Sequence, residues 1–562
     1  METPRILLTA ALVIASTTAS TRASEIISAC IPGSESVQWS KNFPPQWSNL
    51  LDDAFSQARG PVMFEKASAI YRSAKAPYVA REVAEYLRAK SYYVEGAEHV
   101  AYKKFLDLSQ KELGPAVSVE ARVAALECMM HLQNDLPSLI VNNPKHSDIL
   151  RRLLQRSDLT IYQRRIVAQF LTIRMKELVN RWDKAEIEVI LDALRNEGPF
   201  LTYAQLLVVQ RHGNYTKAVS FLEQLLERGK LPKEFDRDRE TLVLIYARDL
   251  YEMKKYQKSA DIVRLIPRDS NYLPQALSDL TWALLMANKK REAVGTAFNI
   301  QKSLLNKTFT PEAPLVASIA YFEMCQYARA LKNSVYFKKK YLPILNWYKR
   351  LTIEQTEKPY DLLVSSLRKK ASVPNVVLLE WLRSPEFRAV QGEANAVFAE
   401  RRLAYNLIAE RLNSEKGSFW VKEWKSPLVE FYKNTKGSQK ELGARLNKTL
   451  KSANKRIAAG IGRLIENTQL LEIEIFDAAG EDMVWRNINP DYQRWSLAQP
   501  DEKRDPDRLW VWGEVPVDPA SKDEIWEDEL GWTLGNIDDE CKLKNKYKQL
   551  KVKSATKTAV IN

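Results

Sequence analysis

Between residues 199 and 343 one short sequence pattern returns four times, with drift. Its instances are Gly213-Asn214-Tyr215-Thr216-Lys217-Ala218, Lys254-Lys255-Tyr256-Gln257-Lys258-Ser259-Ala260, Lys289-Lys290-Arg291-Glu292-Ala293 and Cys325-Gln326-Tyr327-Ala328-Arg329-Ala330. The repeated alanines (218, 260, 293 and 330) stand 42, 33 and 37 residues apart. A period of this size is typical of a supersecondary unit repeated along a solenoid.

Each repeat is interpreted as a helical hairpin. The alanine marks the point where two helices approach closely, because a larger side chain would separate their axes, and the preceding tyrosine fills the turn. Apolar residues later in the second helix close the layer between neighbouring hairpins: Leu222, Leu225, Val263, Ile266, Ala297, Ile300 and Phe337. Pro232, Pro267 and Pro343 are expected to end the units.

A small residue, an aromatic or aliphatic residue and a closing proline at these offsets resemble the tetratricopeptide-repeat family over about 145 residues. The chain departs from the family in the first helix of each unit, where Trp282 and scattered leucines and alanines replace the usual Trp, Leu and Gly. The resemblance implies that the first helices line a concave, partner-binding groove. The groove residues implied here are Tyr203, Gln210, Arg211, Arg248, Tyr251, Gln275, Trp282, Phe322 and Glu323.

Helical periodicity extends beyond the repeats, from about Ser48 onward. One apolar stripe keeps helical spacing from Leu442 to Ile475 and predicts a single long helix. A basic face runs beside that stripe and consists of Lys448, Lys451 and Lys455. It is either an ordinary solvated surface or a contact for an acidic partner.

The composition changes after Asp482, where six of the protein's 14 tryptophans lie and an acidic run spans 523–540. Strand-like alternation occurs only near Leu509–Val515. We expect these tryptophans to be buried by folding back on the long helix, with the acidic run facing its basic face. The lysine-rich end is predicted to be disordered.

These patterns predict an all-α protein: an α-solenoid of tetratricopeptide-like hairpins, with a long C-terminal helix and a small Trp-rich, mostly irregular cap. The expected segments are a signal peptide (1–23), N-terminal hairpins (24–198), repeats (199–343), a long-helix region (344–480), an acidic cap (481–541) and a basic tail (542–562).

The N-terminus has the features of an export signal, with Arg5 before the apolar run Ile6–Ala15 and small residues through Ala23. The run is about half as long as the ~20 residues that a spanning helix needs. Ile27-Ser28-Ala29-Cys30 resembles a lipobox, which would make Cys30 a lipid attachment point, but Arg22 and Glu25 interrupt the apolar sequence expected before it.

Charge and cysteine usage are interpreted in the light of export. An exported chain with a formal net charge of +14 would meet envelope proteins, anionic envelope polymers or lipid surfaces rather than nucleic acid. An oxidising compartment permits disulfides among Cys30, Cys128, Cys325 and Cys541, and three complete pairings are open. No two cysteines form a CxxC pair, so we expect no metal site.

The sequence carries no convincing catalytic motif. It has four histidines and none of the patterns HExxH, GxSxG or GxxxxGK. Cys128 and His131 could form a thiolate–imidazolium pair, but a buried cysteine beside a surface histidine explains the spacing as well. A peptidoglycan-lytic transglycosylase would need a late Glu-Ser, whereas the only one is Glu35-Ser36, leaving Glu514 or Glu529 for a divergent site.

The stretch from Glu524 to Trp532, with a cysteine shortly after, resembles the end of tetratricopeptide proteins from the envelopes of gliding and predatory bacteria. The resemblance implies a non-enzymatic scaffold for protein–protein interactions in an envelope machine, in the periplasm or on the periplasmic face of the outer membrane. We expect no cofactor and no small-molecule substrate. The alternative hypothesis is a peptidoglycan-binding or peptidoglycan-lytic superhelical protein.

Overall fold

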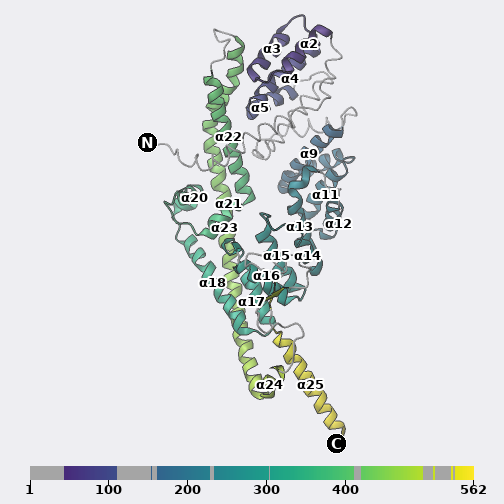
Figure 1. The fold of residues 1–562 in the computed structure, drawn as a ribbon, viewed down its shortest axis with the longest axis vertical. Coiled ribbons are helices and arrows are strands. Elements are labelled where there is room, and N and C mark those ends of the chain that lie inside the picture. The colour runs from purple at the N-terminus through teal and green to yellow at the C-terminus, as the bar shows by residue number, and fades with distance from the viewer. Residues whose placement is uncertain are drawn as a thin grey trace. The chain divides into compact units, whose positions relative to one another are not determined.

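The computed structural model describes residues 44–110, 154, 161–227, 233–302, 304–410, 419–497, 510–512, 533–535 and 538–561. The predicted signal segment, Cys30, Cys128, Glu514 and Glu529 lie outside these residues. The described chain is almost entirely helical and forms a packed series of adjacent helix pairs, which confirms the all-α solenoid class (Figure 1). It divides into two compact units, each built from two separate stretches of sequence.

Unit 1 comprises residues up to 207 together with 388–446. Its helices are α2 (Pro45–Phe55), α3 (Gly60–Arg72), α4 (Tyr78–Val94), α5 (Glu98–Gln110), α9 (Ile161–Arg181), α10 (Lys184–Ala193), most of α11 (Pro199–Arg211), most of α22 (Pro385–Ala409) and the start of α23 (Phe419–Ile488). Its main core joins α2–α5 to side chains of α22 and α23. Trp424 of α23 is buried there and stacks on Tyr92 of α4, with ring centroids 5.7 Å apart.

Unit 2 comprises residues 208–387 and those from 447 onward. Its helices before residue 388 are α12 (Tyr215–Leu226), η3 (Lys233–Asp238), α13 (Arg239–Glu252), α14 (Tyr256–Val263), α15 (Leu273–Met286), α16 (Lys290–Lys302), η4 (Leu304–Lys307), α17 (Glu312–Glu323), α18 (Tyr327–Lys349), α19 (Ile353–Glu357), α20 (Pro359–Leu367) and α21 (Asn375–Arg383). The remainder of α23 follows, with α24 (Asp491–Leu497), β1 (Trp510–Trp512), β2 (Thr533–Gly535) and α25 (Glu540–Ile561). Its core is formed by α13–α18 and by Leu471 and Ile475 of α23.

The hairpins share one turn geometry. At Gly213, Lys254, Asn288 and Cys325 the backbone is left-handed, with φ between 58° and 66°. At each of these positions the residue's N–H donates to the carbonyl three residues earlier, and the next N–H donates to the carbonyl five residues before itself. These two bonds define a Schellman motif, which satisfies the last carbonyls of the first helix. The same turn at Gly96 joins α4 to α5 in unit 1.

This shared turn corrects the register of the second repeat. Five residues beyond the left-handed position stand Ala218, Ser259, Ala293 and Ala330, all of them buried, so Ser259 rather than Ala260 is the structural equivalent. The turns are therefore 41, 34 and 37 residues apart. A serine fits because its hydroxyl donates to the Ala247 carbonyl of the facing helix at 2.6 Å.

The small residue at this position can be tested in the fourth hairpin. Ala330 is fully buried where α18 meets α17, and Ser318 of α17 donates to its carbonyl at 2.8 Å. Replacing Ala330 with leucine should destabilise unit 2 by ~1–3 kcal/mol, because the added atoms force the helices apart. The measurement is urea unfolding, with amide hydrogen exchange of α17 and α18 to assign the transition. Ala328→Leu, at an exposed site on the same helix, should change little; equal effects at the two positions would contradict the close-packing argument.

Two expectations about helix ends are wrong. Pro343 does not end the fourth unit but lies inside α18, where the buried side chains of Tyr341 and Ile344 hold the helix on both sides of it. The C-terminal lysine-rich segment is helical rather than disordered, as α25. Its first turn is held by Asp539, which accepts from the Lys542 N–H at 2.9 Å, and Tyr547 is buried against an aromatic cluster.

That aromatic cluster consists of Trp485 of α23, Tyr492 and Trp495 of α24, and Tyr547 of α25. Lys544 and Lys548 of α25 lie 4.5 and 5.5 Å from the Trp485 ring. Cation–π contact and coverage by the lysine stems explain why so basic a segment is held against the fold.

The long-helix prediction is confirmed, and α23 extends it at both ends to 70 residues. The stripe from Leu442 to Ile475 is largely buried along it, as in the case of Leu450 and Ile461. The expected charge pairing of the cap is not found where the structure can test it. Glu540 pairs with Arg486, and Lys451 of the basic face pairs with Glu357 of α19.

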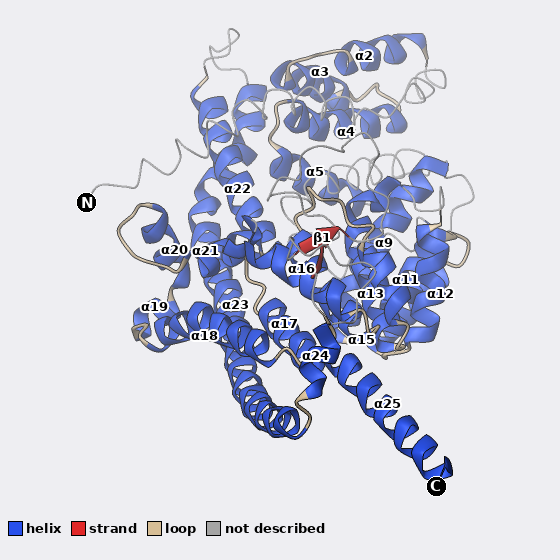
Figure 2. Cartoon of the chain, turned by 60° about the horizontal axis from the view of Figure 1, so that its bottom comes forward, coloured by secondary structure: helices blue, strands red, loops and turns tan. Residues whose placement is uncertain are grey.

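Within the cap, β1 and β2 form a short antiparallel pair, with Trp510 opposite Gly535 and Trp512 opposite Thr533. Strand β2 lies against α16, the second helix of the third hairpin, and not against the long helix as expected (Figure 2). The strand-like alternation predicted near residues 509–515 is therefore confirmed, while its docking surface differs from the expected one.

Candidate functional site

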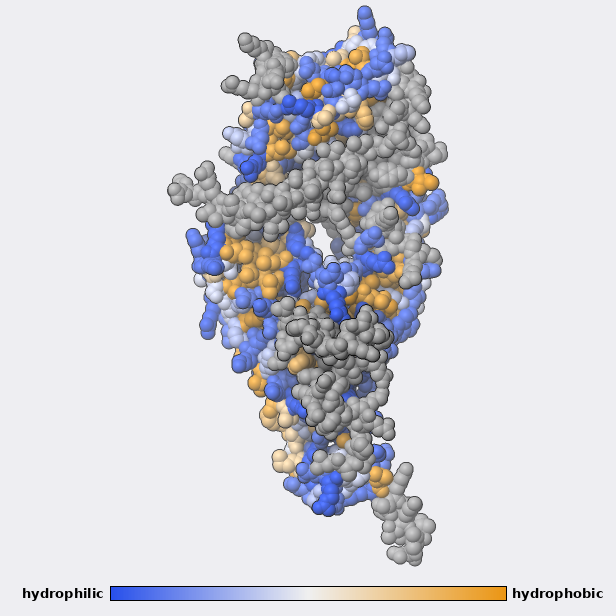
Figure 3. All heavy atoms as spheres, in the orientation of Figure 1, coloured by the Kyte–Doolittle hydropathy of each residue, from blue (hydrophilic) through white to orange (hydrophobic). Residues whose placement is uncertain are grey.

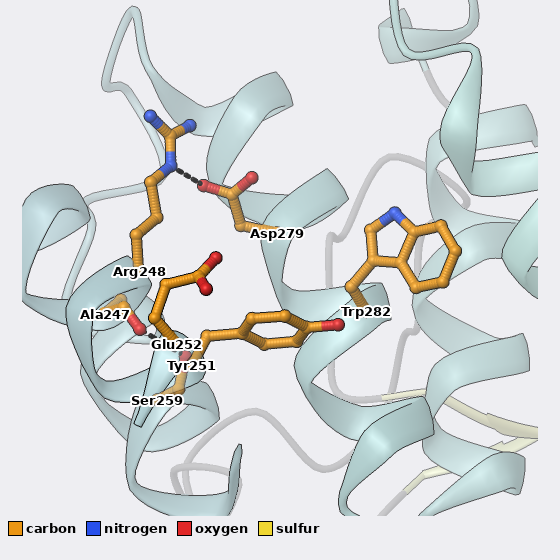
Figure 4. A pocket seen from close by; sticks show the side chains of 7 residues that line it. All are labelled: Ala247, Arg248, Tyr251, Glu252, Ser259, Asp279 and Trp282. Atoms are coloured by element: carbon orange, nitrogen blue, oxygen red, sulfur yellow. Dashed lines mark hydrogen bonds and ion pairs between the residues drawn. The ribbon is translucent and has the colours of Figure 1, made fainter. Parts of the chain in front are cut away.

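A pocket of about 340 Å³ opens on the first helices of two consecutive hairpins in unit 2. It is lined by Ala247, Arg248, Tyr251 and Glu252 of α13, Ser259 of α14, and Asp279 and Trp282 of α15. Figure 4 shows the Tyr251 ring extending across the pocket toward Trp282. Two aromatic walls and three charged side chains therefore meet in one concave site.

The pocket's two carboxylates differ in their surroundings. Asp279 accepts a hydrogen bond from Arg248 Nε at 2.8 Å, yet burial keeps the pKa of Asp279 above its usual value, and Glu312 raises it further. Glu252 is exposed at the pocket surface and makes no hydrogen bond or ion pair with any residue that the structure describes. Asp279 is thus paired with a cation inside the site, whereas Glu252 is not.

Trp282 is fixed by a third acidic residue. Its indole Nε1 donates to Glu312 Oε2 at 2.8 Å, and Glu312 is the first residue of α17. A carboxylate at a helix N-terminus is stabilised by the exposed N–H groups of the first turn. This contact ties the ring, which belongs to the third hairpin, to the first helix of the fourth hairpin.

The wall formed by α13 also carries Asp249, which faces the preceding hairpin. Gln210 Nε2 donates to Asp249 Oδ2 at 2.6 Å. Burial, with a further contribution from Glu252, raises the pKa of Asp249 to about 6 although the Gln210 hydrogen bond opposes the shift. Tyr251 also has a raised pKa because of burial and of nearby Tyr256, Glu252 and Glu312. The region around the pocket is therefore electronegative in a chain with a net charge of +14.

The structure brings together three of the nine groove residues inferred from the sequence: Arg248, Tyr251 and Trp282. Gln210 contacts the neighbouring Asp249, and Arg211 and Gln275 are exposed without lining the pocket. Phe322 packs against Tyr327, with centroids 6.1 Å apart, and Glu323 pairs with Lys290 at 3.4 Å.

Tyr203 does not belong to this site. It is buried in unit 1, where Lys176 lies 5.2 Å from its ring centroid. Its position on a first helix suggested a groove residue, but the small exposed fraction of its side chain (4%) shows it to be core.

Sequence reasoning missed Ala247, Glu252, Ser259 and Asp279. A local signal was available for two of them, because residues three or four apart share a helix face: Glu252 follows Arg248 by four and Asp279 precedes Trp282 by three. Ser259 lies on a second helix, and only the hairpin geometry brings it here.

A second exposed surface lies on the C-terminal part of α23. Its apolar side chains are between 59% and 72% exposed: Leu470, Ile473, Phe476, Met483, Val484 and Ile488. Apolar residues reach the surface over this part of the helix (Figure 3). Contiguous exposed apolar residues on a folded chain are typical of an interaction surface.

The remaining candidate residues are dispersed. On the basic face, Lys448 and Lys455 are exposed while Lys451 contacts Glu357. Cys325, in the α17–α18 turn, forms a disulfide with Cys541 of α25, 216 residues away. The backbone beside the disulfide is also bonded, because the Glu540 N–H donates to the Met324 carbonyl at 3.0 Å.

A buried ionic contact lies in unit 1, between His99 and Glu400. Glu400 of α22 accepts from the backbone N–H groups of His99 and Val100 at the start of α5, and its Oε2 contacts His99 Nδ1. Burial alone would lower the pKa of His99, but Glu400, with smaller contributions from Glu98 and Glu393, raises it above its ordinary value. The pair is a structural link between α5 and α22.

Among the described residues, no group of three or more His, Cys, Asp or Glu is placed to hold a metal ion. In the same part of the chain, no helix is both long enough and apolar enough to cross a membrane. Comparison with protein-family models and with curated protein sequences gives no match for this chain. Fold and pocket together define the class: an all-α protein of stacked helical hairpins with a concave site on its first helices.

Proposed function

We propose that this protein is a non-enzymatic scaffold that binds a segment of a partner protein along the first helices of its tetratricopeptide-like hairpins. The observation that carries this proposal is the pocket between α13 and α15, which is lined by the half-buried side chains of Tyr251 and Trp282 on consecutive first helices. Aromatic residues with a polar edge supply contact area and a hydrogen-bonding tip, and they are enriched where proteins bind one another.

The repeat architecture supports the same function. Each hairpin contacts its neighbours in sequence, so a row of first helices can present one extended surface instead of a closed cavity. The exposed apolar part of α23 offers a further contact surface within the same unit. The sequence features of an export signal favour an envelope partner.

Site-specific photo-crosslinking in intact cells tests this function. A photoreactive phenylalanine analogue at Glu252, at the pocket edge, should give a discrete crosslinked product whose partner is an envelope protein. The matched control is Gln257 on α14, which is exposed and does not line the pocket. Equal products from both positions, or a cytoplasmic partner at Glu252, would refute the proposal.

A further inference from the structure

The pocket carries an unbalanced charge beside two aromatic rings. Arg248 forms an ion pair with Asp279, with Arg248 Nε 2.8 Å from Asp279 Oδ2. Figure 4 shows the Arg248 guanidinium directed toward Asp279 and away from Trp282. Of the charged residues that line the pocket, one arginine thus stands against two carboxylates, and Glu252 is left uncompensated.

The surroundings deepen this imbalance. Glu312 accepts a hydrogen bond from the Trp282 indole at 2.8 Å, and Asp249 lies on the same helix as Glu252. Asp279 and Glu252 in the pocket lining, with Glu312 and Asp249 beside it, crowd acidic side chains here. The pKa of Asp249 is raised to about 6 mainly by burial, with a smaller contribution from Glu252. A ligand with a positive charge would relieve this crowding, whereas an anion would add to it.

The aromatic rings indicate which kind of positively charged group would bind. The faces of tryptophan and tyrosine attract a guanidinium or ammonium group through the ring quadrupole. The Tyr251 ring is itself held by Tyr256, with centroids 5.1 Å apart in an edge-on arrangement, and Trp282 is held by Glu312. Both walls are therefore fixed before a ligand arrives, so little side-chain entropy is lost on binding.

We propose that the pocket takes an arginine or lysine side chain of the partner segment, placed between Tyr251 and Trp282 with its charge facing Glu252. This inference rests on the proposed scaffold function and names the side chain which that function recognises. The bond between Arg248 and Asp279 shows a guanidinium already paired with a carboxylate of this pocket. The partner's cation would pair in the same way with the second carboxylate, Glu252.

The test uses the full chain labelled with 5-fluorotryptophan and followed by fluorine NMR. The Trp282 resonance is assigned by its loss in Trp282→Phe. The probes are the blocked peptides acetyl-Gly-Ser-Arg-Ser-Gly-amide and its lysine and citrulline counterparts, at matched ionic strength. The arginine or lysine peptide should shift the Trp282 resonance saturably, and the citrulline peptide, which has nearly the same shape without the charge, should bind roughly three- to tenfold more weakly.

Glu252→Gln should also weaken the binding of the arginine peptide roughly three- to tenfold and leave the binding of the citrulline peptide unchanged. Glu354→Gln is the matched control, because Glu354 is an exposed carboxylate of the same unit that does not line the pocket. Equal binding of the arginine and citrulline peptides, or no effect of Glu252→Gln, overturns the cation site. If crosslinking at Glu252 still captures an envelope protein, the scaffold function survives that result. Charge-selective peptide binding without such a product retains the cation site and removes the scaffold function.

Discussion

Replacing His99 with leucine is expected to lower the free energy of unfolding of unit 1 by ~3–5 kcal/mol. His99 and Glu400 are both buried, with side-chain exposures of 8% and 5%. Leucine fills a comparable volume but removes the cation that faces Glu400. The carboxylate would keep only the backbone N–H donors at the start of α5, and an uncompensated buried charge costs far more than the lost contact itself.

A double variant separates charge from packing. In His99→Leu/Glu400→Gln the side-chain amide can still accept from the α5 backbone, but no charge is left buried, so at least half of the lost stability should return. Urea unfolding measures the stability, and hydrogen exchange of α5 and α22 assigns it to unit 1. A loss below about 1 kcal/mol in the single variant would show that the pair contributes little.

The same pair sets a pH dependence whose sign follows from the raised pKa of His99. Burial lowers this pKa, but Glu400, Glu98 and Glu393 together raise it, and Glu393 is itself paired with Arg445 at 2.7 Å. A pKa raised above the unfolded value contributes stability that is fully present below ~6.5 and is lost as the pH rises through the folded pKa. Unit 1 should therefore lose stability toward alkaline pH, and His99→Leu should flatten that loss.

The architecture could be predicted because its signals are local. Helical spacing along residues 442–475 and recurring small residues near 218, 293 and 330 depend on neighbours within one or two helices, so the sequence shows them directly. The register slip at Ser259 shows the limit of this reasoning. Alanine at 260 fitted the pattern by residue type, whereas the left-handed turn at Lys254, a conformation uncommon for lysine, fixes the position.

The pocket could be predicted only in part because it needs two hairpins at once. Tyr251 and Trp282 could be inferred from the resemblance to tetratricopeptide repeats. Phe322 packs on Tyr327 as Tyr251 packs on Tyr256, yet it does not line the pocket. Which of these aromatic side chains line a pocket depends on the packing of neighbouring hairpins and not on the residue type alone. The helical C-terminus was missed for the same reason. Its lysines look disordered in sequence, while Trp485 and Asp482, more than 50 residues earlier, hold it in place.

Removing the disulfide should destabilise unit 2 by ~2–4 kcal/mol. Cys325 and Cys541 close a loop of 216 residues, and a crosslink of that span restricts the unfolded chain strongly. The double variant Cys325→Ser/Cys541→Ser also weakens the attachment of α25 to the α17–α18 turn. There the Gln326 side chain donates to the Asp538 carbonyl at 3.1 Å. The helix α25 is also attached to α23, where Lys544 pairs with Asp482 at 2.7 Å.

Two measurements follow this disulfide prediction. The oxidised protein should unfold at a higher temperature than the double variant. In limited proteolysis, the start of α25 should be cleaved earlier in the double variant than in the oxidised protein. Cys30→Ser/Cys128→Ser retains the described crosslink and is the matched control, so it should behave as the unaltered chain does. A reductant should lower the unfolding temperature of that control to the value of the Cys325→Ser/Cys541→Ser variant, because both then lack the same bond.

If the reductant left the control unchanged, or if free-thiol counting of the denatured, non-reduced protein found four thiols, the crosslink would not exist in solution. The aromatic cluster around Tyr547 would then be the main anchor of α25, since its burial does not depend on the cysteines.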